Sequence, residues 1–192
     1  KTPCFYTRNA VTFEYDPHPP KPTEFPEFLK SLWTDDQSGA IDDQSIATLQ
    51  EIFGYLLVGA TRLQKIFMII GPKRSGKGTI GRVLRQLLGQ RNVCAPSLTS
   101  LGRSFGGQVL IDTTLAIISD ARLKGRDTAV IVEELLSISG EDAKTISRKY
   151  LPDWTGMLKT RFLLLTNELP GIEDESGALA SRFIVLALKN SF

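Results

Sequence analysis

One loop in this sequence combines glycines, a lysine and a hydroxyl at spacings that suit phosphate chemistry. Residues 71–79 read Gly-Pro-Lys-Arg-Ser-Gly-Lys-Gly-Thr. Glycines at both ends allow the backbone N–H groups to turn inward, and a following helix would direct its positive dipole end toward the same point. A lysine here adds charge for the β and γ oxygens of a nucleoside triphosphate. We therefore assign nucleotide binding to Gly71, Pro72, Ser75, Gly76, Lys77, Gly78 and Thr79.

The hydroxyl that would help to hold Mg²⁺ is displaced by one position. Gly78 follows the lysine, where serine or threonine is usual, and Thr79 comes next. We assign the magnesium role to Thr79, with ATP and Mg²⁺ as the expected ligands. The Gly-Lys-Gly-Thr ending also occurs in small nucleotide kinases. The loop by itself therefore predicts a nucleotide and leaves the reaction open.

The segments on both sides of the loop have the patterns that this chemistry requires. Residues 66–70 form a continuous apolar run, as expected of a central parallel strand that is covered on both faces. After the loop, apolar residues recur at helical spacing until Gly89. A strand, the loop and a helix are therefore predicted in the order that phosphate binding needs.

Polar residues end three further elements. Asp120 follows the apolar run 115–119 and is expected to hold Mg²⁺ through water at the carboxyl edge of the sheet. Asn167 ends the strand predicted over 161–167 and could hold the attacking water. Arg182 precedes the last strand and could reach a γ-phosphate in a neighbouring subunit. We therefore predict Lys77, Asp120, Asn167 and Arg182 as the catalytic set.

The position after Asp120 departs from the usual pattern. Ala121 stands where a glutamate that polarises water is usual. Either Asp120 serves both purposes, or an acid such as Glu133 or Glu134 comes close.

Three regions are predicted along the chain. Residues 1–26 are rich in proline and read as a linker or strap. Residues 27–62 form a helical collar, with an amphipathic piece from Glu27 and a helix that begins after two aspartates and ends near Gly59. Residues 63–192 alternate strands and helices and form the ATPase domain. The predicted fold class is α/β, a mostly parallel P-loop NTPase sheet flanked by helices.

Composition limits the other possibilities. The chain has 192 residues, of which 42% are hydrophobic, and its net charge is +2. No apolar stretch approaches the roughly 18 residues that cross a bilayer, so we expect a cytoplasmic protein without a membrane partner. With one histidine and two distant cysteines, zinc ligation and a histidine-dependent triad are implausible. The chain starts at Lys1, without a methionine, and we expect a piece of a longer protein.

The order and spacing of these motifs resemble the superfamily III helicase domain of phage and plasmid primase-helicases. The resemblance rests on the loop 71–79, the strand that ends at Asp120, the segment Ser-Gly-Glu-Asp at 139–142, and Leu-Leu-Thr-Asn at 164–167. It implies an AAA+-type sheet, a ring that is typically hexameric, and ATP hydrolysis coupled to movement on single-stranded DNA inside a bacterial host. It also implies a primase region upstream in the same polypeptide.

The same resemblance suggests roles for individual residues. Lys77 and Thr79 match the nucleotide loop, Asp120 the magnesium strand and Asn167 the polar sensor. Arg182 matches the arginine finger less closely, because Ala-Ser precedes it where the family often has tryptophan and paired arginines. Three basic residues fall in the insert where the family places a DNA-tracking hairpin: Lys144, Arg148 and Lys149. They would bind phosphates without reading sequence.

Two alternatives stay open at the level of sequence. A nucleotide-binding assembly or loading ATPase would form oligomers with ATP without unwinding DNA, and Ala121 favours it slightly. A small-molecule nucleotide kinase would need an acceptor lobe and a lid rich in arginine. The insert over 139–159 is short for such a lid.

Overall fold

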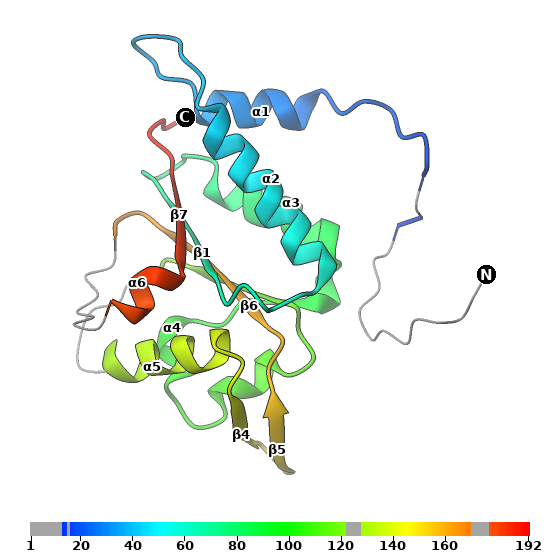
Figure 1. Cartoon of the computed structure of the whole chain (residues 1–192), viewed down its shortest axis with the longest axis vertical. Helices are drawn as coiled ribbons and strands as arrows, with labels where there is room; N and C mark the ends of the chain where they lie inside the picture. Colours follow the sequence, from blue (N-terminus) through cyan, green and yellow to red (C-terminus); the bar gives the residue numbers. More distant parts are fainter. Residues whose placement is uncertain (1–12, 15, 122–127, 170–176) are drawn as a thin grey trace.

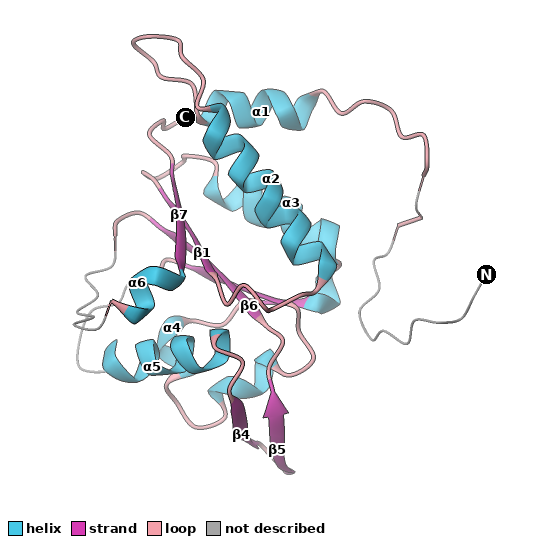
Figure 2. Ribbon diagram, viewed as in Figure 1, coloured by secondary structure: helices cyan, strands magenta, loops and turns pink. Residues whose placement is uncertain are grey.

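A five-stranded parallel sheet forms the centre of the protein (Figure 2). The computed structural model describes residues 13–14, 16–121, 128–169 and 177–192. The strands run in the spatial order β2-β3-β6-β1-β7, and every neighbouring pair is parallel. Their bounds are β1 (Ile66–Ile70), β2 (Val93–Cys94), β3 (Leu115–Ser119), β6 (Arg161–Thr166) and β7 (Phe183–Ala187). The predicted fold class, a mostly parallel α/β sheet flanked by helices, is confirmed.

Helices cover both faces of the sheet (Figure 1). One apolar core joins the sheet to α1 (Glu24–Leu32), α2 (Asp43–Val58) and α3 (Lys77–Leu88). A second core, on the other face, contains side chains of α4 (Leu98–Leu101) and α5 (Thr128–Ser139). The remaining helical pieces are η1 (Gln90–Asn92), η2 (Gly106–Leu110) and α6 (Ala178–Arg182). Successive residues of β1, β3 and β6 alternate between the two cores, which is why these strands are apolar throughout.

The strand register brings three carboxyl ends to one edge of the sheet. Ile70 at the end of β1 lies opposite Thr166 in β6 and Ala187 in β7. Ser119 at the end of β3 lies opposite Leu165. The residues that follow β1, β3 and β6 therefore emerge side by side, which is the usual place for ligand binding in a parallel sheet.

Two helices, α1 and α2, precede β1. In α2, Asp42 accepts a hydrogen bond from the backbone N–H of Ser45 at the start, and Gly59 adopts a left-handed conformation at the end. The first helix, α1, begins at Glu24, earlier than the predicted start at Glu27. Pro26 is compatible with this start because it lies in the first turn, where no backbone N–H is needed for the helical ladder.

A buried arginine joins the collar to the sheet. Arg161, the first residue of β6, is only 4% exposed. Its guanidinium donates hydrogen bonds to the carbonyl oxygens of Tyr55, Leu56 and Ala60 at the carboxyl end of α2, and to that of Thr114 beside β3. Burial lowers the pKa of Arg161. Carbonyls at a helix carboxyl end supply the negative potential that a buried cation requires.

The polar insert between α5 and β6 forms a separate antiparallel hairpin. Its strands are β4 (Ala143–Arg148) and β5 (Leu151–Met157), and Lys149 and Tyr150 form the turn. In Figure 1 the hairpin projects at the bottom of the molecule, whereas α1 lies at the top. Among the described residues, no helix is both long enough and apolar enough to cross a membrane.

Candidate nucleotide-binding site

The loop between β1 and α3 packs too tightly for side chains at its two terminal glycines. A Cβ atom on Gly71 would lie 2.8 Å from the Cβ of Leu188 and from the hydroxyl of Ser75. Gly76 has a φ of 86°, and a Cβ there would lie 2.7 Å from a methyl group of Leu32 in α1. Only glycine fits at both positions. The loop therefore passes closely under α1 and ends at the amino terminus of α3, where backbone N–H groups lack helical partners.

Lys77 lies inside the curve of this loop. Its ammonium group donates to the carbonyl oxygens of Gly71 and Pro72, both at 2.6 Å, and to the hydroxyl of Ser75 at 3.1 Å. Ser75 is itself buried. Partial burial lowers the pKa of Lys77, because removal from water disfavours the charged form. The ammonium group is thus held by loop carbonyls at the position where β and γ phosphate oxygens could replace them.

Thr79 has a neighbour that the sequence analysis did not single out. The guanidinium of Arg82 donates a 2.8 Å hydrogen bond to the Thr79 hydroxyl. The two residues are three apart in α3 and so lie on one face of the helix. That i, i+3 spacing was visible in the sequence and could have identified Arg82.

Asp120 and Asn167 lie at the same sheet edge as the loop. Asp120 directly follows β3 and has a φ of 56°, which turns the chain sharply at that point. Asn167 directly follows β6, and the N–H of Gly71 donates to the carbonyl of Thr166 just before it. Both Asp120 and Asn167 are exposed. A carboxylate and an amide thus follow strands that end at the same edge of the sheet as β1.

These residues fit a magnesium nucleotide. Among the described residues, no three histidine, cysteine or acidic side chains form a group that could hold a metal. A magnesium ion at this edge would draw on the Thr79 hydroxyl, phosphate oxygens and water, and Asp120 would act through water, as the sequence analysis expects. Mg²⁺ commonly keeps several waters and takes few protein ligands when it is bound with phosphates.

Glu133 and Glu134, which could replace the glutamate that is usual at the position of Ala121, lie in different environments. Glu134 forms an ion pair with Lys144, at 2.6 Å between Oε2 and Nζ, and so points toward the hairpin. Glu133 is exposed on α5, which packs on the face of the sheet opposite α3. Ala121 is 1% exposed and could not accommodate a charged side chain without a partner.

A hollow of about 410 Å³ opens beside the loop. Two aromatic residues, Phe28 of α1 and Phe192 of the segment after β7, contribute to its wall. The other lining residues come from α1, the loop and α3: Ser31, Arg74, Gly76, Gly78, Thr79 and Arg82. The volume is within the range typical of small-molecule sites, about 300–1,000 Å³.

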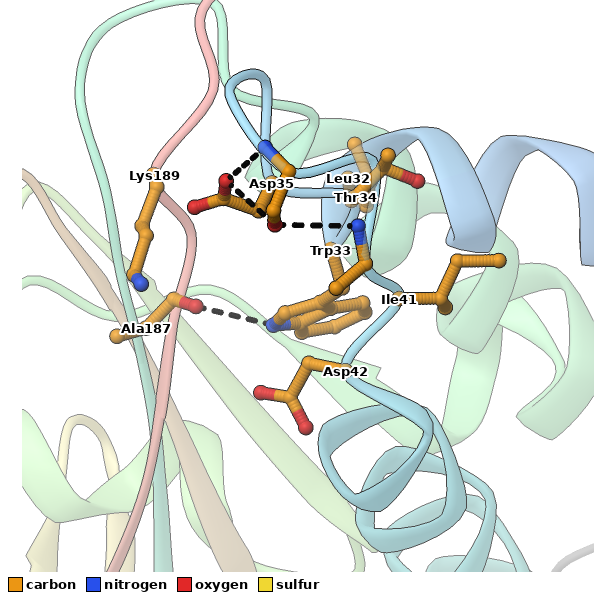
Figure 3. Close-up of a pocket in the computed structure, with 10 residues that line it drawn as sticks. Leu32, Trp33, Thr34, Asp35, Ile41, Asp42, Ala187 and Lys189 are labelled. Atoms are coloured by element: carbon orange, nitrogen blue, oxygen red, sulfur yellow. Dashed lines mark hydrogen bonds between the residues drawn. The ribbon is translucent and has the colours of Figure 1, made fainter.

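A second hollow, of about 290 Å³, lies between the α1–α2 turn and the end of β7 (Figure 3). Trp33 forms part of its wall and donates from its indole nitrogen to the carbonyl of Ala187. Asp35 accepts hydrogen bonds within its own turn, and Asp42 caps α2. Lys189 is its remaining charged group. The two carboxylates thus serve local structure, and the lining includes no residue of the phosphate loop.

Arg182 lies far along the sheet from the loop of its own chain. It immediately precedes β7, whose first residue, Phe183, lies opposite Ile66 at the start of β1. Its guanidinium donates to the carbonyl of Leu136 and to the hydroxyl of Ser139, both at 2.9 Å. In this chain Arg182 therefore caps the carboxyl end of α5, and any contact with a γ-phosphate would have to be made in another subunit.

The three basic residues predicted to bind DNA do not form one group. Arg148 and Lys149 lie at the hairpin tip, where Arg148 donates to the carbonyl of Pro152 and Lys149 lies 5.1 Å from the ring centre of Tyr150. Lys144 is part of β4 nearer its base, and its ion pair with Glu134 holds it against α5. The charge of Lys144 is thus compensated by Glu134 in this structure, and its DNA-binding role stays a prediction. Tyr150, which the sequence analysis did not select, is 92% exposed at the tip.

Two solved structures share the fold. The apo structure of the NrS-1 C-terminal region matches over 86% of this chain with a TM-score of 0.61 and 17% identity. JCV Helicase, solved with a bound acetamide compound, matches over 86% of this chain with a TM-score of 0.54 and 17% identity. The chain spans 37% and 51% of these two proteins, respectively. No curated protein sequence matches the chain.

A family match covers most of the sheet and the candidate site. It extends over residues 69–182, which include the loop, Asp120, the hairpin and Asn167. The chain belongs to the family described as "Family of unknown function (DUF5906)".

Proposed function

We propose that this chain is the ATP-driven motor of a DNA helicase, of the superfamily III type found in phage and plasmid primase-helicases. In this proposal residues 63–192 form the ATPase, residues 27–62 a collar and residues 1–26 a strap. Full-length subunits assemble into a ring, typically a hexamer, that moves on single-stranded DNA in the cytoplasm of a bacterial host. A primase region precedes the motor in the same polypeptide.

The observation that carries the proposal is the meeting of the loop, Asp120 and Asn167 at one sheet edge. Lys77 would hold the β and γ oxygens, and the backbone N–H groups at the start of α3 would hold the remaining phosphate charge. Thr79 and Asp120 would hold Mg²⁺, which neutralises charge on the phosphates during transfer. Asn167 would orient the attacking water through its amide. The fold that the chain shares with JCV Helicase supports this reading.

The position of the hairpin suggests how hydrolysis could act on DNA. One end of β6 follows the hairpin by only a few residues, and the other end leads into Asn167. A strand of six residues therefore joins the base of the basic hairpin to the nucleotide edge. A shift at one end of this buried strand would move the whole strand as a rigid element, because packed cores do not deform continuously.

An ATPase assay with and without single-stranded DNA, combined with sedimentation, tests the proposal. We expect DNA to stimulate hydrolysis under conditions in which the chain assembles. Lys77→Ala should abolish hydrolysis and keep the melting temperature close to that of the wild type, since it removes charge from the loop without emptying the core. A Lys77→Ala protein with normal turnover would refute the loop assignment.

A loading ATPase without unwinding activity is the second candidate. Ala121 favours it, because its burial leaves no room for the acid that usually polarises water. The same assay separates the two: a loading ATPase would bind ATP and assemble, and would not displace a strand from a forked duplex. Transfer of phosphate to a small acceptor would instead support the kinase alternative.

A further inference from the structure

The strand order indicates how a nucleotide bound in the loop would be oriented. Asp120 and Asn167 follow β3 and β6, which lie on one side of β1. The segment after β7 lies on the other side of β1, and α1 contacts the loop at Gly76. A triphosphate in the loop would thus direct its γ-phosphate toward the polar edge. Its nucleoside would extend away from that edge, toward α1 and the segment after β7.

Phe28 lies where that nucleoside would emerge. Its ring tip is 3.1 Å from the position that a Cβ on Gly76 would take, and it shares a stacked contact with Phe25, at 6.0 Å between ring centres. It is only partly buried, so one side of the ring packs on the collar and the rest faces the hollow of about 410 Å³.

Phe192 completes the same wall from the segment after β7. Its backbone N–H donates to the carbonyl of Arg74, and the hydroxyl of Ser191 donates to that of Lys73. Asn190 donates to two carbonyls at the end of α1. These bonds tie the segment to both the loop and α1, whereas the ring of Phe192 remains 62% exposed. A large exposed ring on a fixed backbone gains most when an aromatic ligand covers it.

We propose that the base of the nucleotide stacks on Phe28 and Phe192 and that this site takes nucleotides with little selectivity for the base. The proposal rests on the proposed function, since it needs phosphates in the loop. Base–aromatic stacking contributes roughly 1–3 kcal/mol per base and tolerates any base, because every base has a π face. Purines should bind more tightly than pyrimidines, because their faces are larger.

The polar lining explains the expected lack of selectivity. Ser31 donates its hydroxyl hydrogen to the carbonyl of Phe28, and Arg82 is engaged with Thr79. Among the described residues, no amide or carboxylate side chain lines the hollow. Strong discrimination between bases requires buried polar groups that pair with one base and remain unpaired with another.

Calorimetric titration of the full chain with Mg²⁺ and nucleoside diphosphates tests this site, with inorganic pyrophosphate as the probe for phosphate alone. We expect ADP and GDP to bind within about fivefold of each other, UDP more weakly and pyrophosphate most weakly. Phe192→Ala should weaken the binding of ADP and GDP by about 5- to 150-fold, from the stacking energy, and leave the binding of pyrophosphate unchanged. Phe28→Leu, which keeps apolar bulk on Gly76, should act in the same direction.

Two control variants, Ile41→Ala and Lys77→Ala, make each outcome decisive. Ile41→Ala removes apolar surface from the neighbouring hollow and should leave ADP binding unchanged. An unchanged ADP affinity in Phe192→Ala and Phe28→Leu, an equal loss for pyrophosphate, or a preference for one purine above 100-fold would overturn the base site. Lys77→Ala tests the loop separately: if it still bound pyrophosphate and ADP normally, the proposed function would fail.

Discussion

The guanidinium of Arg82 donates a 2.8 Å hydrogen bond to the hydroxyl of Thr79, the residue that we assign to Mg²⁺. The guanidinium of Arg82 and a magnesium ion would compete for the hydroxyl oxygen of Thr79. Because Gly78 has no side chain, the neighbouring position cannot supply a substitute hydroxyl. The strength of magnesium binding therefore depends on how readily Arg82 releases Thr79.

We expect Arg82→Met to lower the Mg²⁺ concentration that gives half-maximal ATP hydrolysis by roughly three- to tenfold, the scale of one intramolecular hydrogen bond. The measurement is a magnesium titration at saturating ATP. Arg85→Met is the matched control, since it lies on the same helix outside the hollow. A higher magnesium requirement in Arg82→Met would mean that Arg82 assists the site.

The hairpin separates two roles that the sequence analysis had joined. Lys149→Ala should reduce the slope of log binding constant against log salt for single-stranded DNA by about 0.7, since it removes one phosphate contact at the tip. Lys144→Ala should leave the slope unchanged and lower the stability by up to about 1 kcal/mol, because it breaks the ion pair with Glu134. Glu134→Gln should reproduce the stability loss. An altered salt slope in Lys144→Ala would return that residue to the DNA site.

Arg182 combines a visible structural contact with a proposed catalytic one. Arg182→Ala should cost about 1–2 kcal/mol of stability, because it removes two hydrogen bonds from the end of α5. If Arg182 also acts across a subunit interface, Arg182→Ala subunits mixed with Lys77→Ala subunits should regain ATPase activity. The mixing is done below both melting temperatures, with assembly checked by sedimentation. Assembled mixtures without recovery at any ratio would limit Arg182 to its structural contact.

Lys77 predicts a pH dependence of phosphate binding. Burial lowers its pKa, so the free protein loses this charge at a lower pH than an ordinary lysine does. Pyrophosphate affinity should fall as pH rises through that lowered pKa, and Lys77→Arg should show a flatter profile because arginine stays charged. The free energy of unfolding changes with pH in the opposite direction to the pyrophosphate affinity. The unfolded chain holds the proton more tightly, so the cost of burying the charge is present at low pH and disappears as pH rises toward the ordinary lysine pKa.

Among the substitutions considered, we expect replacement of Arg161 to lower the free energy of unfolding most. Arg161→Met should cost about 3–5 kcal/mol, because it leaves several buried carbonyls without donors. Arg161→Lys keeps the charge and loses the planar fork, so it should fall between Met and the wild type. Chemical denaturation measures both variants. A loss below about 1 kcal/mol in Arg161→Met would show that the collar is held to the sheet by its apolar contacts.

Local pattern was sufficient for most elements of the fold. The loop residues 71–79, the apolar strands beside it and the caps of α2 were all identified from spacing, because turns, caps and buried strands depend on nearby residues. The predicted start of α1 at Glu27 was wrong, because a proline in the first turn does not break a helix. Residue spacing indicated the hairpin region only as an insert, and a hairpin was expected there only from the family resemblance, because exposed strands with mixed side chains carry a weak periodic signal.

The sequence by itself determined that a strand, a glycine-bounded loop and a helix occur in the order needed for phosphate binding, and that Asp120 and Asn167 end later strands. Those features depend on residues close together in the chain. Only the tertiary structure decided which distant groups meet. Strand register places Asp120 and Asn167 at the same sheet edge as the loop. Residues of α5 pair with Lys144 and accept a hydrogen bond from Arg182. The segment after β7 places Phe192 in the same hollow as Gly76 and Phe28. Such contacts depend on packing across the sheet, which no local pattern encodes.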